Sequence, residues 1–311
     1  MTLSKKIAKL KKLSDWFANK GIYDIYTNTK VYEILMSEQF GHTLVNGHAY
    51  TSDAVDFAGN YYEYKHYKMS SSNYSWTFND ISENTINNLH SIKSVLFAEI
   101  DDSTIVPSVN KVYIVEGREV AKYLEENNAY IRNHRDMINI RWNQIDDNMK
   151  YEVIYPEKVC FSNELQEIFY IVHDIEEMIG VKGLLTSNKF WELLVAYELD
   201  HNILSEQKKH DACDRWGRTY EYKVSKRMSW TFQDISRNVL DGYLEDEKII
   251  LAVVDKTRFV IEKIYSCEVE AVVSILEYKL AKSKNTKRRA ASIGKTDIRY
   301  MIERGEAECV L

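Results

Sequence analysis

The feature that most constrains the fold of this chain is an internal duplication. The segment DAVDFAGNYYEYK at 53–65 returns as DACDRWGRTYEYK at 211–223, with eight of thirteen residues identical. SWTFNDIS at 75–82 returns as SWTFQDIS at 229–236, with seven of eight identical. Further similar segments follow in the same order in both halves. The chain therefore consists of two copies of one unit.

A repeated unit of about 150 residues is too long for a solenoid and is typical of two similar globular domains. The chain has 311 residues, of which 45% are hydrophobic, so it has enough apolar side chains for a sizeable core. Pro156 interrupts the pattern near the join. We therefore expect an N-terminal domain over 1–155 and a C-terminal domain over 156–311.

Both copies predict the same order of secondary structure. In the first copy, an opening helix over 5–21 precedes a second helix that follows the capping residues at 27–29. A β-hairpin over 53–65, a buried strand over 94–100 and a strand over 111–115 that leads into a helix come next. The predicted fold is mixed α/β (α+β), with two tandem domains that each hold a central mixed sheet flanked by helices.

The hairpin gathers two carboxylates and a lysine. Side chains alternate across a strand, so Glu63 and Lys65 point to the same face. A two-residue turn at 58–59 would add Asp56 to that face, whereas a three-residue turn would add Asp53 instead. The second copy presents the same alternatives with Asp214 or Asp211, Glu221 and Lys223.

These residue types favour metal-assisted chemistry on phosphodiesters. Mg²⁺ usually takes one or two carboxylates and completes its coordination shell with water and substrate phosphate. A bound Mg²⁺ activates water and neutralises charge on the phosphodiester. A lysine beside it orients or deprotonates the attacking water and stabilises the transition state. The sequence therefore predicts hydrolysis with one Mg²⁺ site in each copy.

The arrangement resembles the PD-(D/E)XK nuclease superfamily, and within it the type II restriction endonucleases. In those folds a helix with an acidic residue precedes a hairpin that holds the D…ExK residues, followed by a central strand, a helix and a strand. The resemblance covers the core of both halves. In contrast to the family motif, Ser52 and His210 stand where a proline precedes the aspartate.

The resemblance implies one catalytic set in each copy. The six residues between aspartate and glutamate match the mismatch-repair-type nickases of the same superfamily, which favours the later aspartate of each copy. The implied catalytic residues are Asp56, Glu63, Lys65, Asp214, Glu221 and Lys223. Those with carboxylates would bind the metal, and Glu33, Glu192, Asp53 and Asp211 are further candidate ligands.

Basic residues follow the last predicted helix in both copies. The net charge of the chain is −6, yet residues 282–295 carry six basic groups and no acidic one. A phosphate backbone responds to the local field rather than to the net charge. We expect DNA contacts from Arg135, Arg141, Lys287, Arg288, Arg289 and Lys295.

Four further residues recur in register. His42 and His201 follow the glutamate-bearing helix, where the helix dipole favours a charged histidine. Trp76 and Trp230 lie in the repeated SWTF segments and are expected in the core.

Other classes of protein fit the sequence less well. No run of about 18 apolar residues occurs, so no membrane span is expected. The four cysteines form no CxxC pair, which argues against a zinc ribbon and a disulfide framework and favours the cytoplasm.

By the resemblance, the chain would be a Mg²⁺-dependent, sequence-specific endodeoxyribonuclease that acts on double-stranded DNA. Two catalytic domains related by a pseudo-two-fold axis would let a monomer cut both strands. Two alternatives stay open. One is a structure-specific or repair nuclease without sequence readout, and the other is a non-catalytic duplicated DNA-binding protein.

Overall fold

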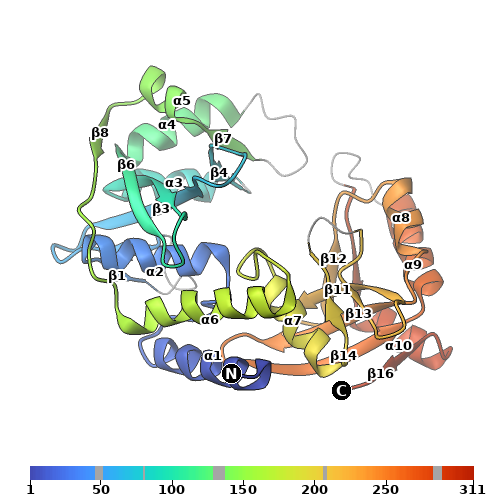
Figure 1. Ribbon diagram of the computed structural model, residues 1–311. Coiled ribbons are helices and arrows are strands. Elements are labelled where there is room, and N and C mark those ends of the chain that lie inside the picture. The colour runs from blue at the N-terminus through green and yellow to red at the C-terminus, as the bar shows by residue number, and fades with distance from the viewer. Residues whose placement is uncertain (46–51, 80, 129–136, 206–208, 283–288) are drawn as a thin grey trace. The chain divides into compact units, whose positions relative to one another are not determined.

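The structure is a computed structural model that describes residues 1–311 except 46–51, 80, 129–136, 206–208 and 283–288. The chain divides into two units, each with its own sheet (Figure 1). We call Asn19–His173 the N-terminal unit. The C-terminal unit comprises Asp174–Leu311 together with Met1–Ala18.

In the described part of the N-terminal unit, six strands form one mixed sheet in the order β1-β2-β3-β5-β6-β8. These strands are β1 (Thr43–Leu44), β2 (Ala54–Val55), β3 (Tyr61–Lys68), β5 (Ser94–Asp101), β6 (Ser108–Glu116) and β8 (Tyr151–Ile154). A separate two-stranded sheet pairs β4 (Trp76–Phe78) with β7 (Ile138–Ile140). The helices are α2 (Asn28–Phe40), α3 (Glu83–Ser91), α4 (Gly117–Asn128) and α5 (Trp142–Asn148).

The described C-terminal unit has a sheet of the same order, β9-β10-β11-β13-β14-β16. Its strands are β9 (Asn202–Ile203), β10 (Ala212–Cys213), β11 (Thr219–Ser225), β13 (Lys248–Asp255), β14 (Val260–Cys267) and β16 (Ala307–Cys309). The two-stranded sheet pairs β12 (Ser229–Phe232) with β15 (Ala291–Gly294). The helices are α7 (Lys189–Glu198), α8 (Arg237–Tyr243), α9 (Val269–Lys282) and α10 (Lys295–Glu303).

The two sheets agree in detail as well as in order. In each, the return strand of the hairpin runs parallel to the central strand, which pairs antiparallel with the next strand. The register slips once in each unit, between Glu99 and Ile100 of β5 and between Val253 and Val254 of β13. The predicted mixed α/β fold class is confirmed. The small sheets β4–β7 and β12–β15 are additions that the sequence did not predict.

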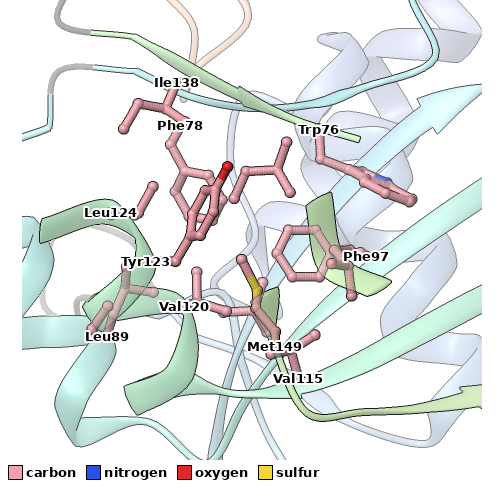
Figure 2. Packing of buried hydrophobic residues seen from close by; sticks show 14 of the residues in the cluster. Trp76, Phe78, Leu89, Phe97, Val115, Val120, Tyr123, Leu124, Ile138 and Met149 are labelled. Atoms are coloured by element: carbon pink, nitrogen blue, oxygen red, sulfur yellow. The ribbon is translucent and has the colours of Figure 1, made fainter. Parts of the chain in front are cut away.

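The repeated tryptophans lie in the cores, as predicted. Trp76 and Trp230 are fully buried, and their indole nitrogens donate to the carbonyls of Ala98 and Ala252 at 2.9 Å and 2.8 Å. Figure 2 shows Trp76 in the N-terminal unit, in the same cluster as Phe97 and the α4 residues Val120 and Leu124. Each tryptophan ties its two-stranded sheet to the central strand, because the buried N–H has its partner there.

The first helix of each predicted domain does not lie entirely within the unit that the sequence predicted. Helix α1 (Leu3–Ala18) begins the chain but belongs to the C-terminal unit, where Lys6 pairs with Asp174 and Lys11 Nζ donates to the Arg258 carbonyl at 2.9 Å. Helix α6 (Asn163–Ile179) is divided, and its residues up to His173 belong to the N-terminal unit. The units therefore differ from the expected ranges 1–155 and 156–311.

This assignment has a simple physical origin. The buried residues of α1 include Leu10, Leu13 and Phe17, which follow the spacing of one helix face. Such a pattern requires an apolar surface to cover but does not specify which one. Because duplication produced two similar sheets, the pattern of α1 is compatible with either of them.

We predict that Leu10→Ala lowers the free energy of unfolding of the C-terminal unit by about 2–5 kcal/mol, because Leu10 is completely buried. Native-state hydrogen exchange resolves the effect by unit: protection should fall in β13 and stay unchanged in β5. Loss of protection in β5 alone would contradict the assignment of α1.

Candidate active sites

The β2–β3 hairpin is closed by a three-residue turn. Asp56 N–H donates to the Asn60 carbonyl at 2.9 Å, and Gly59 N–H donates to the Asp56 carbonyl at 3.0 Å. Gly59 has φ +82°, a left-handed conformation that favours glycine. The strands then pair Val55 with Tyr61. Counting outward from this pair, Asp53 comes opposite Glu63.

Asp56 is therefore not the aspartate that joins Glu63 and Lys65, which corrects the choice made from the family resemblance. Its carboxylate accepts hydrogen bonds from the backbone and side chain of Asn60 and from the Tyr62 hydroxyl, each at 2.8 Å. These bonds to its own hairpin lower the pKa of Asp56, with the Asn60 side chain as the largest cause. Asp56 shapes the turn.

Asp53, Glu63 and Lys65 form the cluster instead. Asp53 Oδ2 accepts the Tyr64 N–H at 2.8 Å, which fixes its carboxylate against β3. Lys65 Nζ donates to Glu63 Oε1 at 2.5 Å and lies 4.9 Å from the centre of the Phe78 ring. Burial raises the pKa of Asp53 well above its usual value, and the charge of Glu63 raises it further.

Helix α2 adds a third carboxylate and a second lysine. The Thr27 side chain accepts the Lys30 N–H at 3.2 Å and so caps the helix. One turn further on, Glu33 is buried and pairs with Lys30. Burial raises the pKa of Glu33, while the charge of Lys30 opposes that shift. The charge of Glu33 also raises the pKa of Asp53, so these carboxylates share one electrostatic environment.

The C-terminal unit repeats the cluster. Its turn is closed by Asp214 and Arg218, and Asp211 Oδ2 accepts the Tyr222 N–H at 2.9 Å. Lys223 pairs with Glu221. In this unit the helix lysine also contacts the hairpin aspartate: Lys189 Nζ lies 3.3 Å from Glu192 Oε2 and 3.8 Å from Asp211 Oδ1.

Asp214, like Asp56, forms its hydrogen bonds within its own turn. It is therefore not the aspartate that joins Glu221 and Lys223, which corrects the choice made from the family resemblance. Its carboxylate accepts the backbone N–H groups of Trp216 and Arg218 at 2.9 Å and 3.0 Å. It also accepts Arg218 Nε at 2.7 Å and the Tyr220 hydroxyl at 3.2 Å. Although burial opposes the change, these bonds lower the pKa of Asp214 to about 2.

Electrostatics in the C-terminal cluster show an excess of buried negative charge. Burial, with the charge of Asp211, raises the pKa of Glu192 to about 7. Burial also raises the pKa of Glu221 to about 7, against the lowering effect of Lys223. For Lys223, burial alone would lower the pKa, but the charges of Glu221 and Asp211 outweigh it and raise the pKa. Lys223 is accordingly an ammonium.

A cavity of about 350 Å³ opens beside this cluster. Glu192 and Lys223 line it together with small polar side chains of the α7 N-terminus, β11 and β12, namely Ser187, Asn188, Ser225 and Thr231. Charged, hydroxyl and amide groups therefore line this cavity together with the rings of Tyr222 and Trp230.

The donor set can be tested against a metal ion by its chemistry. Among the described residues, no three His, Cys, Asp or Glu side chains come together as a metal-binding group. Mg²⁺ requires fewer, since one or two carboxylates with water and phosphate satisfy it. Burial is the largest cause of the raised pKa values of Asp53 and Glu221, and neighbouring carboxylates raise them further. Aspartate and glutamate on facing strands therefore fit a hard divalent cation.

The paired histidines contact tyrosines of the hairpins. His42 Nδ1 lies 2.7 Å from the Tyr64 hydroxyl and His201 Nδ1 lies 2.7 Å from the Tyr222 hydroxyl. Burial lowers the pKa of both histidines, a shift opposite to the one expected from the helix dipole.

The two clusters also differ. His210 Nδ1 lies 2.7 Å from the buried Asp246, whose charge helps to raise the pKa of Glu221. In the first copy the corresponding residues are Ser52 and Ile92. The C-terminal cluster therefore carries an additional acidic neighbour that duplication alone does not explain.

Lys30 and Lys189 are functional candidates that the sequence analysis did not include. The signal was present, because a lysine stands three residues before the helix glutamate in both copies, within contact distance on a helix.

Three of the predicted DNA contacts are exposed. Arg141 directly follows β7, Arg289 lies shortly before β15, and Lys295 begins α10. Arg135, Lys287 and Arg288 lie outside the described residues.

A scan of family models and a search of curated proteins both find no match to this chain. Within the described residues, none of the helices is sufficiently long and apolar to cross a membrane.

We predict opposite effects on stability from two neighbouring aspartates. At neutral pH Asp53→Asn should stabilise the N-terminal unit, because it removes a buried charge whose pKa is raised in the folded state. Asp56→Asn should destabilise it, because Asp56 has a lowered pKa. Urea unfolding measures both effects.

The pH dependence gives the control for this pair. The stabilising contribution of Asp56 is present above the unfolded pKa near 3.8 and is lost as the pH falls below it. The two variants should therefore converge toward the wild type in acid. Equal destabilisation by both variants at neutral pH would contradict the assigned roles.

Proposed function

We propose that this chain is a Mg²⁺-dependent, site-specific endodeoxyribonuclease in which each unit hydrolyses one strand of a DNA duplex. One observation carries the proposal. Two units with the same strand order each bring an aspartate, a glutamate and a lysine together at one hairpin, with a helix glutamate nearby. The corrected sets are Asp53, Glu63, Lys65 with Glu33, and Asp211, Glu221, Lys223 with Glu192.

The carboxylates are assigned to cation binding. Asp53 and Glu63 hold Mg²⁺ in the N-terminal unit, and Asp211 and Glu221 hold it in the C-terminal unit. When bound, Mg²⁺ lowers the pKa of a coordinated water and neutralises charge on the scissile phosphate. The backbone bonds from Tyr64 and Tyr222 orient the two aspartates before any ligand arrives.

The lysines are assigned to electrostatic stabilisation. Lys65 and Lys223 each contact the glutamate of their own cluster and pack over the rings of Phe78 and Phe232. An ammonium fixed in this way lies beside the phosphate and stabilises the negative charge that grows on its oxygens. Such a group requires little reorganisation during the reaction.

The second lysine of each cluster opposes the effect of burial, which raises the pKa of the helix glutamate. Lys189 contacts both Glu192 and Asp211, and Lys30 contacts Glu33. These lysines are positioning residues, because they act on the substrate only through the carboxylates.

The small sheets supply the DNA contacts. In the C-terminal unit, Gly294 of β15 pairs with Ser229 of β12, which lines the cavity beside Lys223. Lys295 follows Gly294 directly, so an exposed ammonium lies near the cavity mouth. Arg141 follows β7 in the N-terminal unit at a similar place. Both contact backbone phosphates and fix the register of the duplex.

The first test is a digest of a long natural DNA with Mg²⁺ or with EDTA, followed by mapping of the product ends. Discrete fragments that require Mg²⁺ support the proposal. Diffuse degradation indicates a nuclease without sequence readout, and intact DNA with retained binding indicates a non-catalytic DNA-binding protein.

The second test separates the two sites on a supercoiled plasmid that contains a mapped cleavage site. Lys65→Ala and Lys223→Ala should each reduce cutting of one strand by about 10²–10³-fold and leave nicked circles, with opposite strands nicked by the two variants.

Lys68→Ala and Lys226→Ala are matched controls. Lys68 lies on the other face of β3 from Lys65, because the spacing along the strand is odd, and Lys226 lies just beyond the end of β11. They should cut both strands as the wild type does. Full double-strand cleavage by Lys65→Ala or Lys223→Ala would overturn the division of labour between the units.

A further inference from the structure

The tip of the β10–β11 hairpin presents an indole ring between two arginines. Trp216 is 65% exposed, which is unusual for the largest apolar side chain. The guanidinium carbon of Arg215 lies 4.0 Å from the centre of the Trp216 ring, and that of Arg218 lies 4.9 Å away. The tip is therefore both aromatic and cationic.

This tip is held rigidly. The Asp214 carboxylate accepts the N–H groups of Trp216 and Arg218 and the Nε–H of Arg218. Gly217, at φ +83°, allows the chain to turn directly behind the ring. Because these bonds fix the backbone that carries the ring, little backbone entropy is lost when the tip binds a partner.

The hairpin turn of the N-terminal unit also carries an exposed aromatic ring, but at a different position. Phe57 is fully exposed on the β2–β3 turn, and the Asp56 carboxylate holds that turn through Asn60 and Tyr62. In the alignment Phe57 corresponds to Arg215, and Trp216 corresponds to Ala58. The sequence of the turn has changed, yet both tips keep an exposed ring and the aspartate that fixes it.

The tips lie close to the clusters. Trp216 is five residues before Glu221, so a fully extended chain places them at most about 17 Å apart. Successive base pairs are about 3.4 Å apart along a duplex. The tip therefore lies no further from the cluster than about five base pairs of a duplex.

We propose that Trp216 and Phe57 stack against nucleobases of the bound DNA, with Arg215 and Arg218 drawing the phosphate backbone to the C-terminal tip. The inference rests on the proposed function, because that function supplies the DNA. In a duplex the faces of the bases are stacked on one another, so an exposed ring reaches them by inserting between base steps, which partly unstacks and kinks the DNA. Guanidinium groups add charge complementarity to the backbone. Asp56 and Asp214 are the positioning residues of these tips.

The test measures binding rather than cleavage. A fluorescein-labelled duplex of randomised sequence is titrated with the full chain, with Ca²⁺ in place of Mg²⁺. Trp216→Ala should weaken binding by about tenfold, within the range for loss of one base–aromatic stack. Trp216→Phe keeps a ring and should restore most of the affinity. Tyr155→Ala removes a similarly exposed ring, at 70%, that also lies near a lysine, and should bind as the wild type does.

A second readout reports stacking itself. Binding of the duplex should quench intrinsic tryptophan fluorescence in the wild type, and Trp216→Phe should lose most of that quenching while it still binds. Asp214→Ala should weaken binding as Trp216→Ala does. Unchanged affinity in Trp216→Ala would overturn the inference, as would wild-type protein that fails to bind the duplex.

The outcomes separate this inference from the proposed function. Wild-type protein that binds the duplex through Trp216 but never cuts DNA with Mg²⁺ would support the role of the tips in DNA binding and contradict the proposed nuclease activity. Wild-type protein that cuts DNA, together with a Trp216→Ala variant that binds and cuts normally, would support the nuclease activity and contradict the role of the tips in DNA binding.

Discussion

The three-residue turn of each hairpin is the constraint on which the sites depend. Side chains alternate along a strand, so a turn shorter by one residue would place Asp56 rather than Asp53 on the face of Glu63. The turn is fixed by hydrogen bonds from Asn60 and Tyr62 to Asp56, and by a left-handed glycine. A carboxylate at the tip therefore determines which other carboxylate meets the lysine.

Two identical aspartates in each copy thus have different tasks. Asp53 lies among other carboxylates in a partly buried cluster, and burial and the charges of Glu63 and Glu33 raise its pKa. Asp56 lies in a network of donors, and its lowered pKa reflects stabilisation of the fold. Retention of a residue in both halves shows that the unit needs it, but retention does not distinguish chemistry from architecture.

This distinction explains what the sequence could and could not predict. The duplication, the hairpins, the buried central strands and the core tryptophans follow from repeats, periodicity and turn residues, all of which are local signals. Sequence alone left the choice between Asp53 and Asp56 open, because turn length depends on side-chain hydrogen bonds such as Tyr62 to Asp56. The placement of α1 was not predicted either, because an amphipathic face does not name the sheet that it covers.

The differences between the units show how a duplicated chain can change while its geometry is maintained. His210 and Asp246 contact each other in the C-terminal unit, where the first copy has Ser52 and Ile92, and Asp246 adds negative charge near Glu221. The order of the strands, the register slip in the central strand and the lysine–glutamate contact are the same in both units. Changes have therefore accumulated around a fixed arrangement of two facing strands. That arrangement holds a lysine against a glutamate on one strand and fixes an aspartate to the backbone of the same strand in both units.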